Sequence, residues 1–433
     1  MPSPESQRTR LLEIYAAAVA VVQGQRCVRE YLWRDAAVPA QAASARQPAT
    51  GLFDAGASPR LPPTGPVYVI ALGKAACSMT RGALDVLKER IVNAYVVTKD
   101  GCEERLPWPC YTAGHPLPDE RSLTAGDGLV AFIAALPQDA QVLVLLSGGA
   151  SALVECPASG VDLAQLRAAN AWLLASGLDI VECNRVRKRL SRIKGGRLAA
   201  LLAPRPVLCL AISDVPGNDI ATIASGPLME DTQGGDWDIA GLPAFLHPLL
   251  QHPPPLPDRD VFRSVRMEIV ATLDQAMTAA AAAATALGYH AILHSDRVMG
   301  DAAAAGARVA QQLCAAHTGE LHIWGGETTL RLPPTPGRGG RNQHLALAAA
   351  LGLQGYAQVF LLAAATDGSD GPGEDAGALV DGDSVARATL HGVDAATALA
   401  TADAGSALAA SGDLIATGPT GTNVMDIMLG LKY

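Results

Sequence analysis

The sequence lacks the short motifs that identify the commonest nucleotide-binding and metal-binding proteins. No G-x-x-x-x-G-K-[ST] motif occurs, which excludes a Walker-type P-loop, and the protein-kinase motif set is also missing. The eight cysteines form no C-x-x-C pair and no zinc-finger spacing, so we expect reduced, mostly buried thiols. A single G-x-G-x-x-A, beginning at Gly126, falls inside a helical pattern and not after a strand, which argues against a dinucleotide fingerprint.

Aromatic residues and net positive charge are both scarce. Aromatics make up 4% of the chain, and the net charge is -9. An acidic chain argues mildly against a nucleic-acid partner, although a local cluster of Lys and Arg can still hold phosphate groups. With 433 residues, of which 49% are hydrophobic, the chain can bury a sizeable core and is too long for one ordinary domain.

Long uninterrupted apolar runs are absent as well. Arg8 and Arg10 precede a run to Val22 that loosely resembles a signal peptide, but Glu13 interrupts it and no small-residue cleavage site follows. We therefore expect an amphipathic first helix and a soluble, cytoplasmic protein with no membrane partner. The sequence leaves open whether two copies form a homodimer.

What the sequence does contain is a series of short apolar runs, each followed by a polar turn and a helical pattern. Runs that are apolar throughout are typical of parallel strands buried on both faces. Four of them lie at 67–72, 94–98, 141–146 and 206–212. They predict βαβ units and an α/β fold with a Rossmann-like, doubly wound parallel sheet.

A change of character at 230–260, where a Gly/Asp-rich loop and a Pro cluster occur, separates a second α/β segment. We expect domains at 1–255 and 256–433, with residues 35–65 as a surface excursion. Within the second domain the patterns predict helices and strands in the following order: helix 274–287, strand 291–294, helix 301–316, strands 321–324 and 328–332 around a Gly-Gly turn, a helix from about 342 and strand 358–365.

Polar, mostly glycine-containing turns follow five of the predicted strands. These turns are Gly73-Lys74, Ser147–Ala152, Ser213–Asp219, Gly325–Thr328 and Thr366–Asp370. Ligands of open parallel sheets collect at the carboxyl ends of the strands, where such turns point the same way. Together the turns indicate a phosphate-handling cleft.

The first turns offer candidates for binding phosphate. Around Ser147, Gly148, Gly149 and Ser151, backbone amides can close on an anion, although a plain tight turn has the same composition. Lys74 projects from a strand end and suits a point-charge contact to a transferred phosphoryl group; a solvated surface lysine is the alternative.

Further candidates for binding phosphate lie downstream. Lys194 belongs to a basic run at 184–197, which is either a solvated helix face or a contact to an anion. Asn218 follows another predicted strand and joins the residues expected to bind the nucleotide.

Acidic residues in two loops are candidates for holding Mg²⁺ together with phosphate oxygens. They are Asp214, Asp367 and Asp370, and Asp-rich turns of this kind also occur for purely structural reasons. Glu327, Arg341 and Asn342 add a carboxylate, a guanidinium and an amide; the planar fork of Arg suits the carboxylate of a small acid or developing phosphoryl charge. For Arg341 the alternative is a surface arginine on a loop.

Ten motifs occur in an order that resembles the glycerate 2-kinase family, whose C-terminal part is called the MOFRL domain. They are Gly73-Lys74-Ala75-Ala76, Thr98-Lys99-Asp100-Gly101, Gly114-His115-Pro116-Leu117-Pro118-Asp119, Ser147-Gly148-Gly149, Ile193-Lys194-Gly195-Gly196-Arg197-Leu198-Ala199, Ser213-Asp214-Val215-Pro216-Gly217-Asn218-Asp219, Gly325-Gly326-Glu327-Thr328, Gly340-Arg341-Asn342-Gln343, Thr366-Asp367-Gly368-Ser369-Asp370-Gly371 and Gly418-Pro419-Thr420-Gly421-Thr422-Asn423. The resemblance runs from about residue 10 to the end of the chain.

The resemblance implies a second α/β domain with a mixed sheet and an active site in the cleft between the domains. It implies phosphorylation of D-glycerate at the 2-hydroxyl by ATP with Mg²⁺, and Lys74 and Arg341 match the family's catalytic positions. Asp214 and Asp367 are the candidates for metal ligand and base. The chain departs from the family pattern at Ala150 and Met425 and around 273–274.

Three other functions stay open at this point. Relatives have been labelled hydroxypyruvate reductases, which would require a nicotinamide cofactor. A kinase of another small hydroxy acid is a second alternative, because one methylene changes binding by only ~1–3 kcal/mol. A non-catalytic metabolite sensor is the third alternative. It does not explain why so many polar residues gather at the strand ends.

Overall fold

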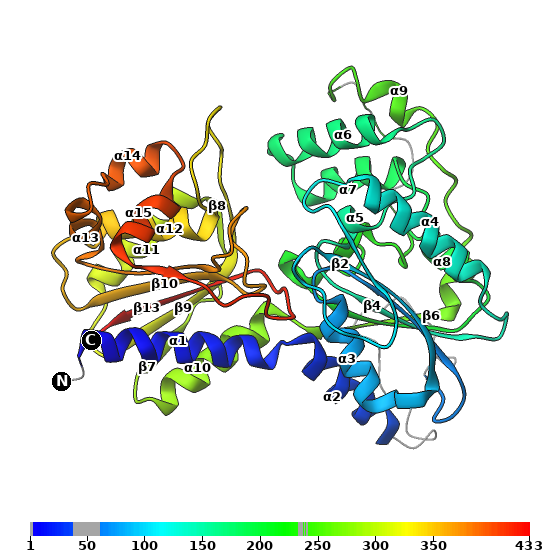
Figure 1. Ribbon diagram of the computed structural model, residues 1–433, viewed down its shortest axis with the longest axis horizontal. Coiled ribbons are helices and arrows are strands. Elements are labelled where there is room, and N and C mark those ends of the chain that lie inside the picture. Colours follow the sequence, from blue (N-terminus) through cyan, green and yellow to red (C-terminus); the bar gives the residue numbers. More distant parts are fainter. Residues whose placement is uncertain (1–2, 38–60, 233–236, 238, 240) are drawn as a thin grey trace. The chain divides into compact units, whose positions relative to one another are not determined.

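The computed structural model describes residues 3–37, 61–232, 237, 239 and 241–433. Its contacts divide the chain into two units, each built around its own sheet (Figure 1). One unit is Gly24–Ala271, and the other joins Met1–Gln23 to Thr272–Tyr433. Most of the predicted 35–65 excursion and residues 233–236 of the predicted loop lie outside the described residues.

This division differs from the predicted domains 1–255 and 256–433 at both ends. Strand β6 (Val265–Ala271) pairs in parallel with β5 (Val207–Ile212), so it extends the first sheet and the join falls after it. Helix α1 (Pro4–Val21) packs against α10 (Leu273–Ala286) and thus belongs with the C-terminal residues. Strand β6 was not predicted because Arg266 and Glu268 interrupt its apolar pattern.

The sheet of the Gly24–Ala271 unit is the predicted doubly wound parallel sheet. Its order is β3-β2-β1-β4-β5-β6, and all neighbours run parallel. The remaining strands are β1 (Val67–Leu72), β2 (Ile91–Lys99), β3 (Cys110–Ala113) and β4 (Gln141–Leu146). The strand order reverses between β1 and β4, and ligands of such sheets bind at this point.

Helices cover both faces of this sheet. Figure 1 shows α2 (Gly24–Ala37) and α3 (Ala76–Leu87) on one face and α4 (Glu120–Ala134) and α8 (Arg197–Leu202) on the other. Asp119 and Asp162 form capping boxes that start α4 and α6. The unit also contains α5 (Ala150–Leu153), α6 (Leu163–Ala175), α7 (Ile180–Arg189) and α9 (His247–Leu250).

The sheet of the other unit is mixed, as the resemblance implied. Its order is β12-β11-β10-β13-β9-β7, with β8 paired to β9. Strands β7 and β8 run parallel to β9, whereas the other pairs are antiparallel. The strands are β7 (His290–Leu293), β8 (Val298–Asp301), β9 (Glu320–Thr329), β10 (Val359–Ala365), β11 (Gly377–Asp381), β12 (Leu414–Ile415) and β13 (Asp426–Lys432).

The predicted turn at Gly325–Thr328 is wrong, because this segment lies inside the continuous strand β9. A Cβ at Gly325 would come 2.6 Å from the sulfur of Met277, and one at Gly326 would come 2.2 Å from the carbonyl oxygen of Val298. The two glycines therefore permit close packing of α10 and β8 against the strand.

Helices also cover both faces of the mixed sheet. Figure 1 shows α1 and α10 on one face and α11 (Ala302–Ala315), α12 (Arg341–Gly352) and α15 (Ala404–Ser411) on the other. The shorter helices α13 (Ser384–Leu390) and α14 (Ala395–Ala400) complete the unit.

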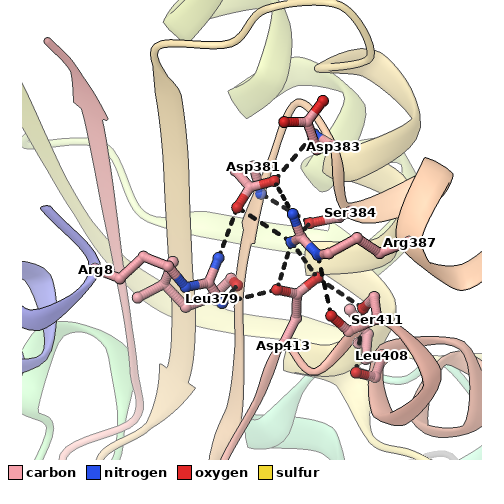
Figure 2. Close-up of polar contacts among 9 residues, drawn as sticks. All are labelled: Arg8, Leu379, Asp381, Asp383, Ser384, Arg387, Leu408, Ser411 and Asp413. Atoms are coloured by element: carbon pink, nitrogen blue, oxygen red, sulfur yellow. Dashed lines mark hydrogen bonds and ion pairs between the residues drawn. The ribbon is translucent and has the colours of Figure 1, made fainter. Parts of the chain in front are cut away.

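Ion pairs fasten the start of α1 to this unit (Figure 2). Arg8 bonds to Asp381 and Asp413, each at 2.7 Å, and Arg387 bonds to the same two carboxylates at 2.9 and 2.8 Å. The side chain of Asp413 is 1% exposed, so its charge relies on these partners. The predicted first helix is confirmed, and it buries Leu11, Ile14 and Tyr15.

Within the described residues no single helix is long and apolar enough to cross a membrane. Only the broken pair of Pro4–Val21 and Gly24–Asp35 passes that test of length and composition when the two are taken together.

Candidate functional site

The loops after β1 and β4 interlock at the point where the strand order reverses. The amide of Lys74 donates to the carbonyl of Gly148 at 2.9 Å, and the amide of Ala75 donates to Oγ of Ser147 at 3.0 Å. Gly73 has a φ of +122°, and a Cβ there would lie 2.3 Å from Oγ of Ser147. The backbone before Lys74 is thus fixed against the neighbouring strand end.

Two side chains flank the predicted phosphate turn. Gly149 has a φ of +86°, and a Cβ there would lie 3.2 Å from Cγ of Lys74 and 3.1 Å from Cδ2 of His115. A side chain at 149 would therefore be strained and crowded, whereas glycine leaves the backbone of the turn open. His115 was not among the predicted site residues, although its motif, Gly114–Asp119, had been noted.

The two serines of the turn contribute differently. Ser147 is fully buried and its hydroxyl is engaged with Ala75, so its hydroxyl lies inside the fold. The hydroxyl of Ser151 lies 3.0 Å from that of Ser225, which donates to Asn184 at 2.9 Å. Both hydroxyls stabilise the loop, and their predicted contacts to phosphate stay a prediction.

Lys194 lies in the interior and forms an ion pair with Glu155. Its side chain is 3% exposed, and Glu155 also accepts hydrogen bonds from Ser191 and the amide of Cys156. Burial lowers the pKa of Lys194, and Glu155 opposes that effect. The ammonium acts here as an internal counter-ion, and a contact to phosphate stays a prediction.

Asp214 and Asn218 follow β5, the neighbour of β4 in the sheet. Asp214 is half-buried, and Asn218 adopts a left-handed conformation with a φ of 56°. The adjacent Asp219 accepts hydrogen bonds from Thr222 at 2.6 Å and from the amide of Ala221 at 3.1 Å. The three strand ends β1, β4 and β5 therefore bring Lys74, the glycine turn and Asp214 to one edge of this sheet.

A second cluster lies at one edge of the mixed sheet. Ala365 at the end of β10, Asp426 at the start of β13 and Gly326 in β9 are aligned by the strand register. Arg341 reaches this edge from the start of α12, with its Nε 2.7 Å and its Nη2 3.0 Å from the two oxygens of Asp426. Its Nη1 lies 2.9 Å from Glu327.

This pairing fixes the guanidinium of Arg341. The Asp426 carboxylate is fully buried, and the bidentate contact holds the planar group in one orientation. Burial opposes the charge of Arg341, but Asp426 and then Glu327 raise its pKa well above the ordinary value. The sequence analysis did not predict Asp426 as a site residue, because the sequence shows only an aspartate at the start of an apolar run.

Asp370 and Asn342 meet at the start of α12. Asp370 accepts hydrogen bonds from the amides of Asn342 at 3.0 Å and Gln343 at 2.8 Å, and it is 2% exposed. Burial raises its pKa to about 6, against the effect of these two amides. Its carboxylate therefore caps the start of α12, and both of its oxygens are engaged in these hydrogen bonds. Its predicted role as a metal ligand stays a prediction.

Asp367 is the more accessible carboxylate of its loop. It is half-buried, and one oxygen accepts the amide of Ser369 at 2.9 Å. Among the described residues no group of three or more His, Cys, Asp and Glu side chains is arranged to hold a metal ion. The carboxylates could therefore hold Mg²⁺ only together with phosphate oxygens and water. This is the usual coordination of a nucleotide-bound Mg²⁺.

Two family models match the chain. One, described as a domain of unknown function (DUF4147), covers residues 10–240, and the other, the MOFRL family, covers residues 320–426. The first match begins in α1 and otherwise lies in the Gly24–Ala271 unit, and the second lies in the other unit.

Curated relatives match over most of their length. D-glycerate 2-kinase of Thermotoga maritima is 35% identical over 84% of this chain and 90% of its own length. A putative hydroxypyruvate reductase of Agrobacterium vitis is 38% identical over 84% of this chain and 98% of its own length. Human glycerate kinase is 31% identical over 84% of both chains.

Solved structures share the whole fold. The glycerate kinase of Thermotoga maritima matches with a TM-score of 0.77 and 32% identity, covering 99% of this chain and all of its own. A protein from Pyrococcus horikoshii matches with a TM-score of 0.68 and 30% identity, covering 98% of each chain.

Proposed function

The chain belongs to the glycerate 2-kinase family with a C-terminal MOFRL domain, and from this premise we propose that it transfers the γ-phosphoryl group of ATP to the 2-hydroxyl of D-glycerate. The products would be 2-phosphoglycerate and ADP. The observation that carries the proposal is the fixed guanidinium of Arg341, which a fully buried Asp426 holds in one orientation. Phosphoryl transfer depends on positioned positive charge of this kind.

We assign Lys74 to the transferring phosphoryl group. Its backbone is fixed by the Gly148 carbonyl, and its side chain passes the open turn at Gly149. An ammonium beside the backbone amides of a glycine turn neutralises phosphate charge as a point charge, while the amides orient the oxygens. Gly148 and Gly149 supply those amides in this proposal, with Ser147, Ser151, Lys194 and Asn218 as supporting residues.

Arg341 is assigned to the carboxylate of glycerate or to developing phosphoryl charge. Its Nε and Nη2 are committed to Asp426, and its Nη1 contacts the half-exposed Glu327. A substrate carboxylate would compete with Glu327 and not with the buried Asp426. The buried side-chain oxygen of Asn342 has no hydrogen-bond partner among the described residues. It is a polar group next to Arg341 that a substrate contact or water would satisfy.

The half-buried carboxylates Asp214 and Asp367 are assigned to proton transfer and to metal binding. Both are half-buried, and one of them would accept the proton of the substrate hydroxyl as general base. Mg²⁺, when bound, supplies neutralisation of charge on the phosphate oxygens. The location of the reaction in a cleft between the two domains stays a prediction.

Two relatives from Agrobacterium vitis are named putative hydroxypyruvate reductases, which favours a reductase as a second candidate. The parallel sheet with strand order 3-2-1-4-5-6 suits a dinucleotide as well as a phosphate group. However, the first turn is Gly73-Lys74-Ala75-Ala76, and the G-x-G-x-x-A at Gly126 lies inside α4. The dinucleotide fingerprint is thus missing from the place where the fold would need it.

The proposal is tested by a coupled assay with D-glycerate, ATP and Mg²⁺. The product is fed to enolase, pyruvate kinase and lactate dehydrogenase without phosphoglycerate mutase, and a control omits glycerate. A glycerate-dependent signal without mutase identifies 2-phosphoglycerate. A signal only with mutase places the phosphate on the 3-hydroxyl. A separate cuvette holds the protein, NADH and hydroxypyruvate without the coupling enzymes, and NADH loss there identifies the reductase.

A further inference from the structure

Two cysteines touch in the Gly24–Ala271 unit at a place the proposed reaction does not use. The sulfur atoms of Cys77 and Cys110 lie 3.1 Å apart although the residues are 33 positions apart in the chain. Both are free thiols. A disulfide needs the sulfurs at about 2.05 Å, so small side-chain rotations would bring the pair to bonding distance.

The surroundings of the pair favour oxidation. Cys77 lies in the first turn of α3, where the helix dipole favours a thiolate. The hydrogen bond from Cys110 lowers the pKa of Cys77, and, against burial, a backbone amide at Glu104 lowers it further. Cys77 is buried, whereas Cys110 is half-exposed at the start of β3. The contact with Cys77, and then burial, raise the pKa of Cys110, so Cys110 becomes a nucleophile by passing its proton to Cys77. Cys110 is the accessible sulfur of the pair, and Cys77 is the acceptor of its proton.

The pair also lies close in the chain to Lys74. Helix α3 begins at Ala76, two residues after Lys74, and Ala75 is the residue whose amide bonds to Ser147. A covalent bond from Cys77 to β3 would fix this first turn of α3. A displacement of about 1 Å in a catalytic group can lower a rate by about a hundredfold.

We propose that Cys77 and Cys110 are an oxidation site, at which a hydroperoxide converts the two thiols into a disulfide that reversibly slows the enzyme. The effect on rate rests on the proposed kinase function, whereas disulfide formation does not. The Cys77 thiolate accepts the proton of Cys110, and the Cys110 sulfur attacks the peroxide. An S–O bond forms, the O–O bond breaks, and the leaving oxygen takes a proton from solvent and departs as an alcohol or water. The Cys77 thiol then attacks the sulfenic sulfur; the S–S bond forms, the S–O bond breaks, and the departing hydroxide takes the Cys77 proton to leave as water.

The test exposes the full chain to hydrogen peroxide and measures thiols, intact mass and glycerate-dependent ADP formation. We expect the eight free thiols to fall by two, the intact mass to lose two hydrogen atoms, and a peptide joining Cys77 to Cys110 to appear. The rate should fall about tenfold or more, and dithiothreitol should restore it.

Variants separate this pair from the other thiols. Cys110→Ser, at a half-exposed position, should keep the rate of the reduced enzyme and lose its sensitivity to peroxide. Cys314→Ser, a half-exposed thiol of the other unit, is the matched control and should remain sensitive. Absence of the joined peptide, or equal thiol loss in Cys110→Ser, overturns the site. A disulfide that forms without slowing the enzyme overturns the regulatory effect, and a reduced enzyme with no kinase activity overturns the proposed function alone.

Discussion

At the scale of single residues, Lys74 and Arg341 are placed by opposite means. The backbone of Lys74 is fixed by hydrogen bonds between loops, and its side chain passes a turn without side chains. The head group of Arg341 is itself fixed, by the two oxygens of Asp426. Substitution of Lys74 should therefore act on the chemistry, whereas loss of the partner of Arg341 should also act on stability.

Lys74→Ala should fold normally and lower kcat by on the order of 10²–10³, because one positioned cation is removed from the developing phosphoryl charge. Steady-state kinetics in the coupled assay measures the change. Lys88→Ala, at an exposed position of the same unit, is the control and should leave kcat unchanged. A near-normal kcat for Lys74→Ala would remove Lys74 from the catalytic residues.

Asp426→Asn should lower the free energy of unfolding by about 3 kcal/mol, because it removes the fully buried partner of Arg341. Glu327→Gln removes a partner that is 38% exposed and should cost less than about 1 kcal/mol. Urea unfolding of both variants gives the comparison. Equal losses for the two would show that burial does not distinguish these ion pairs.

Asp370 should make stability depend on pH in an unusual direction. Burial raises its pKa to about 6, above the value of ~3.9 in the unfolded chain. Between these values the folded chain holds a proton that the unfolded chain has lost. The stabilising contribution is therefore complete below about pH 3.9 and is lost as the pH rises through about 6.

Asp370→Asn should flatten this part of the pH profile, by about 2–3 kcal/mol between pH 4 and 7. Asp394→Asn is the comparison. Hydrogen bonds from Thr397 lower the pKa of Asp394, so the contribution of Asp394 to stability is lost as the pH falls. Urea unfolding at several pH values measures both variants. A profile for Asp370→Asn that is parallel to that of the unsubstituted protein would contradict the assignment.

At the scale of elements, α1 supports the loops that carry the candidate residues of its unit. The buried hydroxyl of Tyr15 donates to the carbonyl of Ala365 at 2.7 Å, two residues before Asp367. The hydroxyl of Thr422 donates to the carbonyl of Val22 at 2.6 Å. The helix therefore holds the ends of β10 and of the segment before β13.

Tyr15→Phe should cost about 1 kcal/mol of unfolding free energy, because the buried carbonyl of Ala365 loses its donor. Because the loop of Asp367 loses its support, we also expect a lower kcat/KM. Tyr356→Phe, at a position 45% exposed, is the control. Unfolding and kinetics should both be unchanged in that variant, and identical results for the two would show that the contact is dispensable.

The elements that could be predicted were those with a complete local signal. The apolar runs at 67–72 and 141–146 match β1 and β4, and the helix predicted at 274–287 matches α10. Strand β9 was divided in two because Gly325 and Gly326 look like a turn, although they serve close packing. Local sequence does not show which neighbour a glycine accommodates.

Candidate residues could be chosen from the sequence, but the residues with which they form ion pairs and hydrogen bonds could not. The pairing of Arg341 with Asp426 joins residues 85 positions apart, and that of Lys194 with Glu155 joins residues 39 apart. Such pairs depend on strand register and helix packing, which the motifs do not encode. Asp370, predicted as a metal ligand, caps α12 for the same reason.

At the scale of the whole molecule, the unit Gly24–Ala271 has a continuous chain and its own core. A fragment of residues 24–271 should therefore unfold cooperatively by itself, which a thermal melt followed by circular dichroism would show. Residues 272–433 without 1–23 should instead bind a hydrophobic dye, because the face covered by α1 is exposed. A cooperative, dye-free transition in that second fragment would contradict the role of α1.

The division of one unit between the two ends of the chain has a consequence for biosynthesis. Helix α1 leaves the ribosome well before its partner α10, which begins only at Leu273. At about 5–20 residues per second, the intervening stretch takes roughly 10–50 s to translate. During that time Leu11, Ile14 and Tyr15 have no sheet to cover them while the intervening unit folds. The nascent apolar helix is thus a ready substrate for a ribosome-associated chaperone.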